Sequence, residues 1–168
     1  MSNYVAAITG GAGHLGQAVS HKLAMRGVDI IVLDKNVQAG KDFAAALVKQ
    51  YGGKHCFIEA DLMQPETFAA VAADIQKQFG RLDYLVNNAA FYDATPGWGV
   101  PFAEESYEAW QKVMRVNLLA PFFLVQSLHP LLKESDDASV VNIGSIYGVV
   151  GPEHGLYVGT KMTNPAAY

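Results

Sequence analysis

Ile8-Thr9-Gly10-Gly11-Ala12-Gly13-His14-Leu15-Gly16 is the stretch that determines the fold of this chain, because it places the pattern G-x-G-x-x-G at Gly11, Gly13 and Gly16. An apolar segment at residues 4–8 precedes it and has the length and composition of a buried strand. A helical pattern follows and ends at residues 26–27, where a glycine indicates a helix C-terminus. Glycines between a strand and a helix let the backbone approach a pyrophosphate, whose charge then lies at the helix N-terminus. The stretch therefore predicts a dinucleotide-binding turn.

Asp34 follows a second apolar segment, residues 30–33, and lies about 20 residues beyond the glycine turn. A carboxylate in this place accepts hydrogen bonds from both ribose hydroxyls and repels a 2′-phosphate. Asp34 therefore favours NAD over NADP, and the neighbouring Lys35 weakens that preference slightly. We expect NAD to contact this first unit at Thr9, Gly10, Gly11, Gly13, His14, Leu15, Gly16, Asp34 and Lys35.

The chain has 168 residues, of which 51% are hydrophobic and 17% charged, as in one globular domain with a substantial core. Its net charge of −4 argues against nucleic-acid binding. The N-terminus lacks a signal-peptide pattern and the single cysteine, Cys56, suits a reducing compartment, so we expect a cytoplasmic protein. The most apolar window, residues 116–132, contains Asn117 and two prolines, so no membrane span is expected. The histidines form no short-spaced cluster, so no metal site is expected.

Strands and helices alternate along the rest of the chain. Strands are expected at residues 56–59, 82–86 and 138–143, and helices at 39–51, 65–79 and about 105–133. This alternation predicts a three-layer, doubly wound α/β Rossmann fold: a parallel sheet in the order 3-2-1-4-5, formed by a single domain over residues 1–168. Ligands of such sheets bind beyond the carboxyl ends of the strands, and Asp61, Asn87 and Ser145 all follow strands.

The chain resembles the short-chain dehydrogenase/reductase family over essentially its whole length. The matching residues are Thr9-Gly10 to Gly16, Asp34, Asp61-Leu62, Asn87-Asn88-Ala89-Ala90, Asn117 and Ser145. The resemblance implies that Asp61 and Leu62 flank the adenine. It implies that Asn87, Asn88, Ala89 and Ala90 line the cofactor and steady the central strand. It also implies that Ser145 polarises the substrate carbonyl or alcohol.

His14 departs from the short branch of the family, which usually has glycine at this place. The spacing of the turn resembles the extended, sugar-nucleotide branch, whereas Asn-Asn-Ala-Ala at 87–90 belongs to the short branch, which we favour. His14 is either a structural variant at the helix start or a phosphate contact.

Asn117 is expected to share a helical stripe with Trp110, Val113, Met114, Pro121 and Val125, so that a polar side chain lies among buried apolar ones. Pro121 has no N–H to donate to the carbonyl oxygen of Asn117, so this oxygen is expected to be free at a kink and able to hold a water. In the family, the matching Asn holds a water in the proton relay. The alternative is a helix bend relieved by local solvent.

Two tyrosines are candidates for the family's acid/base, which is a Tyr with a Lys four residues later on the same helix face. Tyrosine, with a pKa near 10, is a poor base at neutral pH until an adjacent ammonium stabilises its phenolate. Tyr157 and Lys161 have the required spacing, although Gly159 lies between them. The other candidate is Tyr168, in a segment that is typical of a helix start, with its lysine expected beyond residue 168. In that case Tyr157 would be an aromatic residue of the substrate loop.

These features predict an NAD-dependent oxidoreductase that interconverts a secondary alcohol and a ketone by a Ser-Tyr-Lys type mechanism. The alternatives are a sugar-nucleotide epimerase or dehydratase and a non-catalytic NAD-binding module. The resemblance implies further strands and a substrate-covering segment, so the chain is expected to be incomplete at its C-terminal end. The family also suggests a homodimer or homotetramer, although the apolar faces of the 105–133 helix fit a core as well as an interface.

Overall fold

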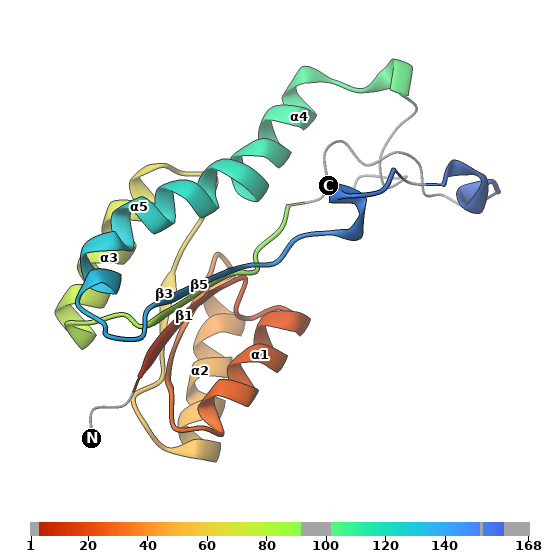
Figure 1. Cartoon of the computed structure of the whole chain (residues 1–168). Helices are drawn as coiled ribbons and strands as arrows, with labels where there is room; N and C mark the ends of the chain where they lie inside the picture. The colour runs from red at the N-terminus through yellow and green to blue at the C-terminus, as the bar shows by residue number, and fades with distance from the viewer. Residues whose placement is uncertain (1–3, 92–101, 152, 160–168) are drawn as a thin grey trace.

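Five parallel strands form the central sheet of the computed structural model, which describes residues 4–91, 102–151 and 153–159. The strands are β1 (Val5–Thr9), β2 (Asp29–Asp34), β3 (Cys56–Glu59), β4 (Tyr84–Asn87) and β5 (Ser139–Asn142). Their order in the sheet is β3-β2-β1-β4-β5, and every neighbouring pair is parallel. All strands therefore end at the same edge, on the right of Figure 1. The predicted strand order is confirmed.

Helices cover both faces of this sheet (Figure 1), which confirms the predicted three-layer α/β fold. α1 (His14–Ala24) and α2 (Val37–Tyr51) lie on one face. On the other face lie α3 (Glu66–Phe79) and α5 (Ala120–Lys133), and α4 (Tyr107–Met114) continues into α5 through a π-helical turn at Arg115–Leu119. Short 3₁₀ turns span Phe102–Glu104, Ile146–Gly148 and His154–Tyr157. No helix among the described residues is both long and apolar enough to cross a membrane.

Local capping signals set several helix ends. The side chain of Asn36 accepts a hydrogen bond from the Ala39 N–H at 3.1 Å, which caps the start of α2. Ser106 caps α4 in the same way, through the Ala109 N–H at 3.1 Å. α3 ends at Gly80, whose φ of 70° places it in the left-handed region that favours glycine.

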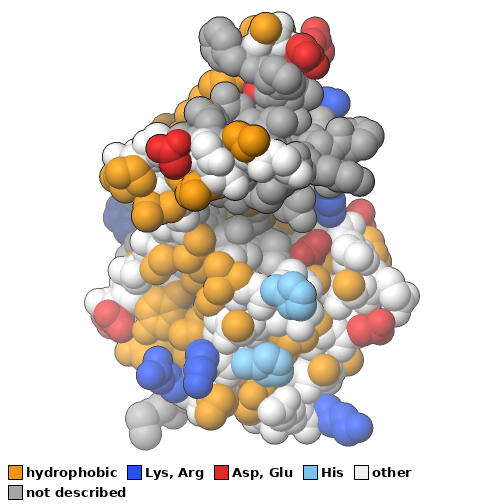
Figure 2. Space-filling view, turned by 90° about the vertical axis from the view of Figure 1, so that its right-hand side faces the viewer, with side chains coloured by type: hydrophobic (Ala, Val, Ile, Leu, Met, Phe, Trp, Pro, Cys, Tyr) orange, Lys and Arg blue, Asp and Glu red, His pale blue; other side chains and the backbone are white. Residues whose placement is uncertain are grey.

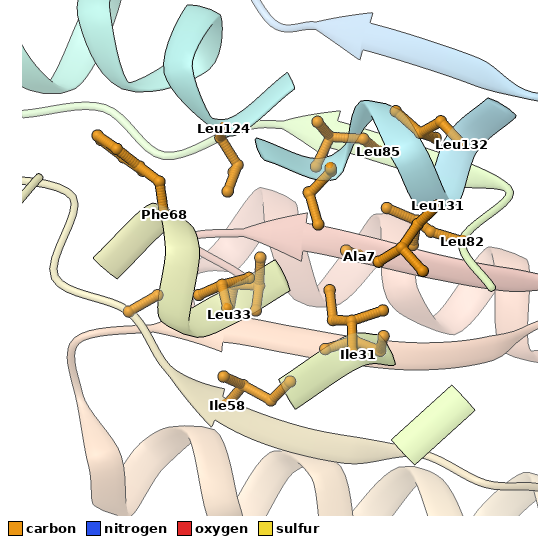
Figure 3. Packing of buried hydrophobic residues seen from close by; sticks show 14 of the residues in the cluster. Ala7, Ile31, Leu33, Ile58, Phe68, Leu82, Leu85, Leu124, Leu131 and Leu132 are labelled. Atoms are coloured by element: carbon orange, nitrogen blue, oxygen red, sulfur yellow. The ribbon is translucent and has the colours of Figure 1, made fainter. Parts of the chain in front are cut away.

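Two apolar cores fill the space between the sheet and its helices. Ile31 and Leu33 of β2 point toward α3 and α5, where the core includes Phe68 and Leu124 (Figure 3). The intervening Val32 points to the opposite face and packs in the core beneath α1 and α2. This alternation follows from the two-residue period of a strand, and burial on both faces explains why the strand sequences are continuously apolar.

β5 differs from the other strands because all four of its residues are exposed. It pairs with β4 on one side only, and it forms one end of the described sheet. Val140 and Val141 are 38% and 46% exposed. Within the described part of the chain, the layers are therefore complete over β1, β2 and β4 and open at β5.

Candidate active site at the strand ends

The glycine turn after β1 packs too tightly for side chains at three of its positions, and a Cβ on Gly11 would lie 2.8 Å from the carbonyl oxygen of Ile8. Gly10 has a φ of +60°, and a Cβ there would lie 3.0 Å from the Cα of Ala89. A Cβ on Gly16 would overlap the carbonyl oxygen of Gly10. The Gly11 N–H donates to the carbonyl oxygen of Leu33 at 3.2 Å, which fixes the turn against β2. Packing within the protein thus requires glycine here and brings the start of α1 to the edge of the sheet.

The start of α1 presents main-chain donors that an anion can use. Gly13 is the N-cap residue, has an extended backbone and is exposed. The N–H groups of His14, Leu15 and Gly16 have no acceptor in the described part of the chain. The first turn of α1 also has no acidic side chain. These donors lie at the positive end of the helix dipole, so this turn fits the pyrophosphate of a dinucleotide.

Asp34, the last residue of β2, holds the glycine turn in place. Its Oδ2 accepts a hydrogen bond from the Ala12 N–H at 3.1 Å, and its Oδ1 accepts one from the Asn36 N–H at 2.9 Å. A carboxylate has about four acceptor sites, so it can bind ribose hydroxyls as well. The half-buried carboxylate is thus fixed in orientation, while the neighbouring Lys35 is exposed.

Hydrogen bonds of Thr9 and Asn88 connect the turn after β4 to the turn after β1. The buried hydroxyl of Thr9 accepts hydrogen bonds from the Asn88 and Ala89 N–H groups, both at 3.0 Å, and donates to the carbonyl oxygen of Val86 at 3.4 Å. In return, the Asn88 Nδ2 donates to the carbonyl oxygen of Thr9 at 2.9 Å. The Thr9 hydroxyl is therefore engaged by the protein's own backbone, and it positions residues 88–89 against Gly10.

Asp61 shapes the turn between β3 and α3. Its Oδ1 accepts a hydrogen bond from the Met63 N–H at 3.0 Å, and its carbonyl oxygen accepts one from the hydroxyl of Thr67 at 2.9 Å. Asp61, Leu62 and Met63 line the cleft described below, and the preceding Ala60 N–H donates to the carbonyl oxygen of Asp34 at 3.0 Å.

Asn117 lies in the middle of the π-helical turn, and its side chain forms two hydrogen bonds with the backbone of Phe91. Its Oδ1 accepts a hydrogen bond from the Phe91 N–H at 2.7 Å, and its Nδ2 donates to the Phe91 carbonyl oxygen at 3.0 Å. The Ala120 N–H bonds to the carbonyl oxygen of Arg115, five residues back, and Pro121 has no N–H to offer. Where the sequence predicts a kink before Pro121, the structure has a π-helical turn. The side chain of Asn117 has a structural partner that the sequence did not indicate.

The predicted burial of the stripe around Asn117 is only partly correct. Val113 is buried, but Trp110 and Met114 are 43% and 36% exposed. The π-helical turn has more residues per turn than an α-helix. Residues at α-helical spacing on its two sides therefore do not lie on the same face of the helix. Val116 is buried instead, and the members of the stripe that line the cleft are Val113, Met114, Asn117, Pro121 and Val125.

Ser145 follows β5 and caps the 3₁₀ turn at Ile146–Gly148. Its Oγ accepts a hydrogen bond from the Tyr147 N–H at 3.2 Å, and the side chain is half-buried. Just before it, the end of β5 is tied to β4 twice. The Ile143 N–H donates to the carbonyl oxygen of Asn87 at 2.9 Å, and the Asn87 Nδ2 donates to Asn142 Oδ1 at 2.8 Å.

These strand ends open into one cleft of about 1400 Å³. Of the predicted site residues it is lined by Thr9, Gly10, Gly13, His14, Leu15, Asp34, Lys35, Asp61, Leu62, Asn88, Ala89, Ala90, Asn117 and Ser145. Gly11 and Gly16 are buried behind this lining. Figure 2 views this side of the molecule, where apolar side chains are exposed and charged ones are scattered among them.

The side chains of the candidate acid/base residues lie outside the described part of the structure. Tyr157 is the last residue of the 3₁₀ turn at His154–Tyr157, and its side chain is not described. Lys161 and Tyr168 lie outside the described residues.

Sequence reasoning missed Asn142 and Phe91, which also line the cleft. A signal for Asn142 was present, because a polar residue at the carboxyl end of a strand is the feature that identified Asn87. Phe91 gives no such signal, because its backbone, not its side chain, makes the contacts to Asn117.

The chain matches a family model described as short chain dehydrogenase over residues 4–163. A curated relative, a 2,5-dichloro-2,5-cyclohexadiene-1,4-diol dehydrogenase of Sphingobium indicum, is 35% identical over 156 residues. The alignment covers 92% of this chain and 59% of that protein, so the chain spans about three fifths of the relative's length.

Solved structures show the same fold. The L-sorbose reductase of Gluconobacter frateurii, crystallised with NADPH and L-sorbose, has a TM-score of 0.81 and 27% identity, over 89% of this chain and 55% of that one. An NAD⁺-bound xylitol dehydrogenase has a TM-score of 0.80 and 25% identity, over 90% of this chain and 56% of that one.

Proposed function

The chain belongs to the short-chain dehydrogenase family, and on this premise we propose that it acts as an NAD(H)-dependent oxidoreductase that interconverts a secondary alcohol and a ketone. The observation that carries this proposal is the single cleft that joins the glycine turn, Asp34 and Ser145. A site for a dinucleotide and a hydroxyl group suited to polarise a substrate oxygen share one cavity. This arrangement suits hydride transfer better than binding alone.

The preference for NAD rests on Asp34. The solved relatives include one with NADPH and one with NAD⁺, so the cofactor is argued from this chain's own residues. The carboxylate of Asp34 is held by the N–H groups of Ala12 and Asn36, so it cannot easily turn away from a 2′-phosphate. Ribose hydroxyls would donate to it, whereas a phosphate would be repelled.

Ser145 is the residue proposed to orient the substrate oxygen. Its Oγ already accepts the Tyr147 N–H, which leaves the hydroxyl proton as a donor to a carbonyl or alcohol oxygen. When bound, the nicotinamide supplies the hydride acceptor or donor. A tyrosine carries the proton to or from the substrate oxygen, either Tyr168 or the pair of Tyr157 with Lys161. Asn117 is the proposed holder of a relay water, through the main-chain carbonyl oxygen to which Pro121 has no N–H to donate.

The remaining cofactor contacts follow the layout of the cleft. The N–H groups at the start of α1 bind the pyrophosphate, with His14 at its side, and Asp61 and Leu62 flank the adenine. Asn88, Ala89 and Ala90 line the middle of the cofactor. Copies of the chain are proposed to associate into a dimer or tetramer through exposed apolar side chains outside the cleft such as Leu119 and Phe123, which are 45% and 40% exposed.

The cofactor assignment is tested with Asp34→Asn. The amide oxygen can still accept the Ala12 N–H, but the charge that repels a 2′-phosphate is gone. The ratio of the Kd for NADPH to the Kd for NADH, measured by fluorescence titration, should fall about tenfold, which corresponds to about 1.4 kcal/mol. An unchanged ratio would contradict the role of Asp34.

The catalytic assignment is tested with Ser145→Ala against a panel of secondary alcohols and ketones. Turnover should fall about a hundredfold or more, because a donor to the developing charge is lost. The Kd for NADH should stay within about twofold of the unsubstituted protein. NADH binding without turnover of any panel compound by the unsubstituted chain would favour the non-catalytic module instead.

A further inference from the structure

Asn142 is a polar side chain of the cleft to which neither the sequence nor the proposed function gives a role. It is the last residue of β5 and the register partner of Asn87, the last residue of β4. Neighbouring residues of a parallel sheet at the same register point to the same face. Leu85, two residues before Asn87, lies in the core beneath α5, so both asparagine side chains point to the face that α5 covers.

The hydrogen bond between the two asparagines fixes the orientation of the Asn142 amide. The Asn87 Nδ2 donates to Asn142 Oδ1 at 2.8 Å, so the oxygen of Asn142 faces β4. Its Nδ2 group, with two protons to donate, has no acceptor among the described residues. The side chain is exposed and lines the same cleft as Ser145, three residues later. An oriented donor pair therefore faces a ligand cavity.

The strand order shows which part of a bound dinucleotide would reach this donor. Asp34 follows β2 and the glycine turn follows β1, so the adenosine ribose and the pyrophosphate are placed over these two strands. β4 and β5 lie on the other side of β1, and β5 is two strands away from it, about 10 Å. A cofactor that runs along the cleft from Asp34 past α1 therefore places its nicotinamide half over the ends of β4 and β5.

We propose that Asn142, held in register by Asn87, is a positioning residue that donates a hydrogen bond to the nicotinamide riboside half of the cofactor. This inference rests on the proposed function, because it needs a bound NAD(H). The neutral amide serves the reduced and oxidised cofactor alike. Asn87 acts through Asn142 by keeping the oxygen of that amide turned toward β4.

Asn142→Asp separates this role from a purely structural one. A carboxylate keeps an acceptor for the Asn87 Nδ2, so the link between β4 and β5 survives, but it has no proton to donate to the cofactor. The Kd for NADH should rise about three- to tenfold, as for one lost hydrogen bond. The Kd for ADP, which lacks the nicotinamide riboside half, should stay within about twofold and serves as the internal control for the added charge.

Asn142→Ala is the second variant and loses both hydrogen bonds. It should show the same selective loss of NADH affinity, now with a lowered Tm, and it decides the question if the aspartate variant fails to fold. Equal effects on NADH and ADP, or no effect on NADH, would overturn the role of Asn142 alone. If the unsubstituted chain binds ADP but not NADH, this inference and the proposed function fall together.

Discussion

The glycines of the turn after β1 meet different physical demands, although one motif contains them all. Gly16 lies against the backbone of Gly10, where no side chain fits. Gly13 has only the carbonyl oxygen of Gly10 nearby, 3.2 Å from the place of a Cβ, and it faces the cleft. Packing against backbone inside the protein explains the first glycine, whereas the second is exposed at the N-cap of α1 and lines the cleft.

Gly16→Ala should therefore destabilise the protein, because the added methyl group overlaps backbone that cannot move away cheaply. We expect the free energy of unfolding in urea to fall by about 1–3 kcal/mol. Gly13→Ser is the matched control, since serine is a favoured N-cap, and it should change the free energy of unfolding by less than about 0.5 kcal/mol. Equal losses in the two variants would contradict the steric explanation.

His55 is a buried histidine whose environment favours the neutral ring. Its Nδ1 accepts a hydrogen bond from the Ile30 N–H at 3.0 Å, so the ring proton is on Nε2, which meets no partner of bonding geometry in the described part of the chain. Burial lowers the pKa of His55 below its ordinary 6.5, and the nearby Asp29 and the backbone of Gly52 oppose this only in part. Protonation at Nδ1 would also break the bond to Ile30.

The stability of the protein should consequently decrease as the pH falls below about 6.5. As the pH falls, the unfolded chain takes up the proton first, because its histidine has the higher pKa. The free energy of unfolding therefore begins to decrease near pH 6.5 and stops decreasing below the folded pKa of His55. Urea unfolding at pH 7.5 and at pH 5.5 measures this decrease. The decrease should be smaller in His55→Gln and unchanged in the exposed-site control His129→Gln. A decrease of the same size in His55→Gln would assign it to other groups.

At the scale of elements, the π-helical turn between α4 and α5 decides how the helix meets the cleft. It lets the chain pass Pro121, and it directs Asn117 at the backbone of Phe91, where the chain leaves β4. The turn thus joins a helix on one face of the sheet to a strand end that lines the cleft. Its position is a consequence of where Pro121 interrupts the donors of the helix.

Asn117→Ala should remove the contact between the π-helical turn and the backbone of Phe91. Losing both hydrogen bonds to Phe91 should reduce the free energy of unfolding by about 1–3 kcal/mol, because the Phe91 N–H and carbonyl oxygen lose their partners. Hydrogen exchange at the Phe91 amide should accelerate more than at other amides. The control is Gln126→Ala, an exposed residue of α5 that also lines the cleft. Unchanged exchange at Phe91 would show that other contacts hold this segment.

The elements themselves could be predicted well from the sequence. The predicted strands agree with the observed ones to within two residues at each end, because apolar runs, glycine stops and polar caps act locally. The long helix was predicted as one unit with a kink at Pro121, but the π-helical turn and its effect on which residues are buried were not. A helical pattern assumes a constant number of residues per turn, and this helix does not keep one.

Over the whole molecule, the edge of the sheet opposite the cleft is held by a buried carboxylate. Asp83 is fully buried and accepts hydrogen bonds from the Val5 N–H at 2.8 Å, from Arg81 and from the hydroxyl of Ser135. It thereby connects the starts of β1 and β4 to the turn that leads into β5. Burial by itself would raise the pKa of Asp83, but these hydrogen bonds outweigh it and hold the pKa below its ordinary 3.8.

Asp83→Ala should lower the free energy of unfolding by about 1–3 kcal/mol, because the buried Val5 N–H loses its acceptor together with the half-buried Arg81 and Ser135. Asp137→Ala, at an exposed carboxylate that accepts one hydrogen bond from Tyr84, should cost less than about 1 kcal/mol. The contribution of Asp83 is present above pH 3.8 and disappears as the pH falls through its lower folded pKa. If acid unfolding begins above pH 5, and if the pH at which it begins is the same in Asp83→Ala, then carboxylates other than Asp83 cause the acid unfolding.

The sequence by itself determined the succession of strands and helices, the glycine turn, the position of Asp34 at the end of β2, and the face of the molecule that carries the cleft. Each of these depends on patterns within a few residues or on the rule that parallel strands end at one edge. Only the tertiary structure decided the pairs that complete the site and the core. Asn142 meets Asn87 across 55 positions, Asn117 meets Phe91 across 26, and Asp83 meets Val5 across 78. No local pattern encodes such pairs, because the distance between two side chains far apart in the chain is set by strand register and helix packing.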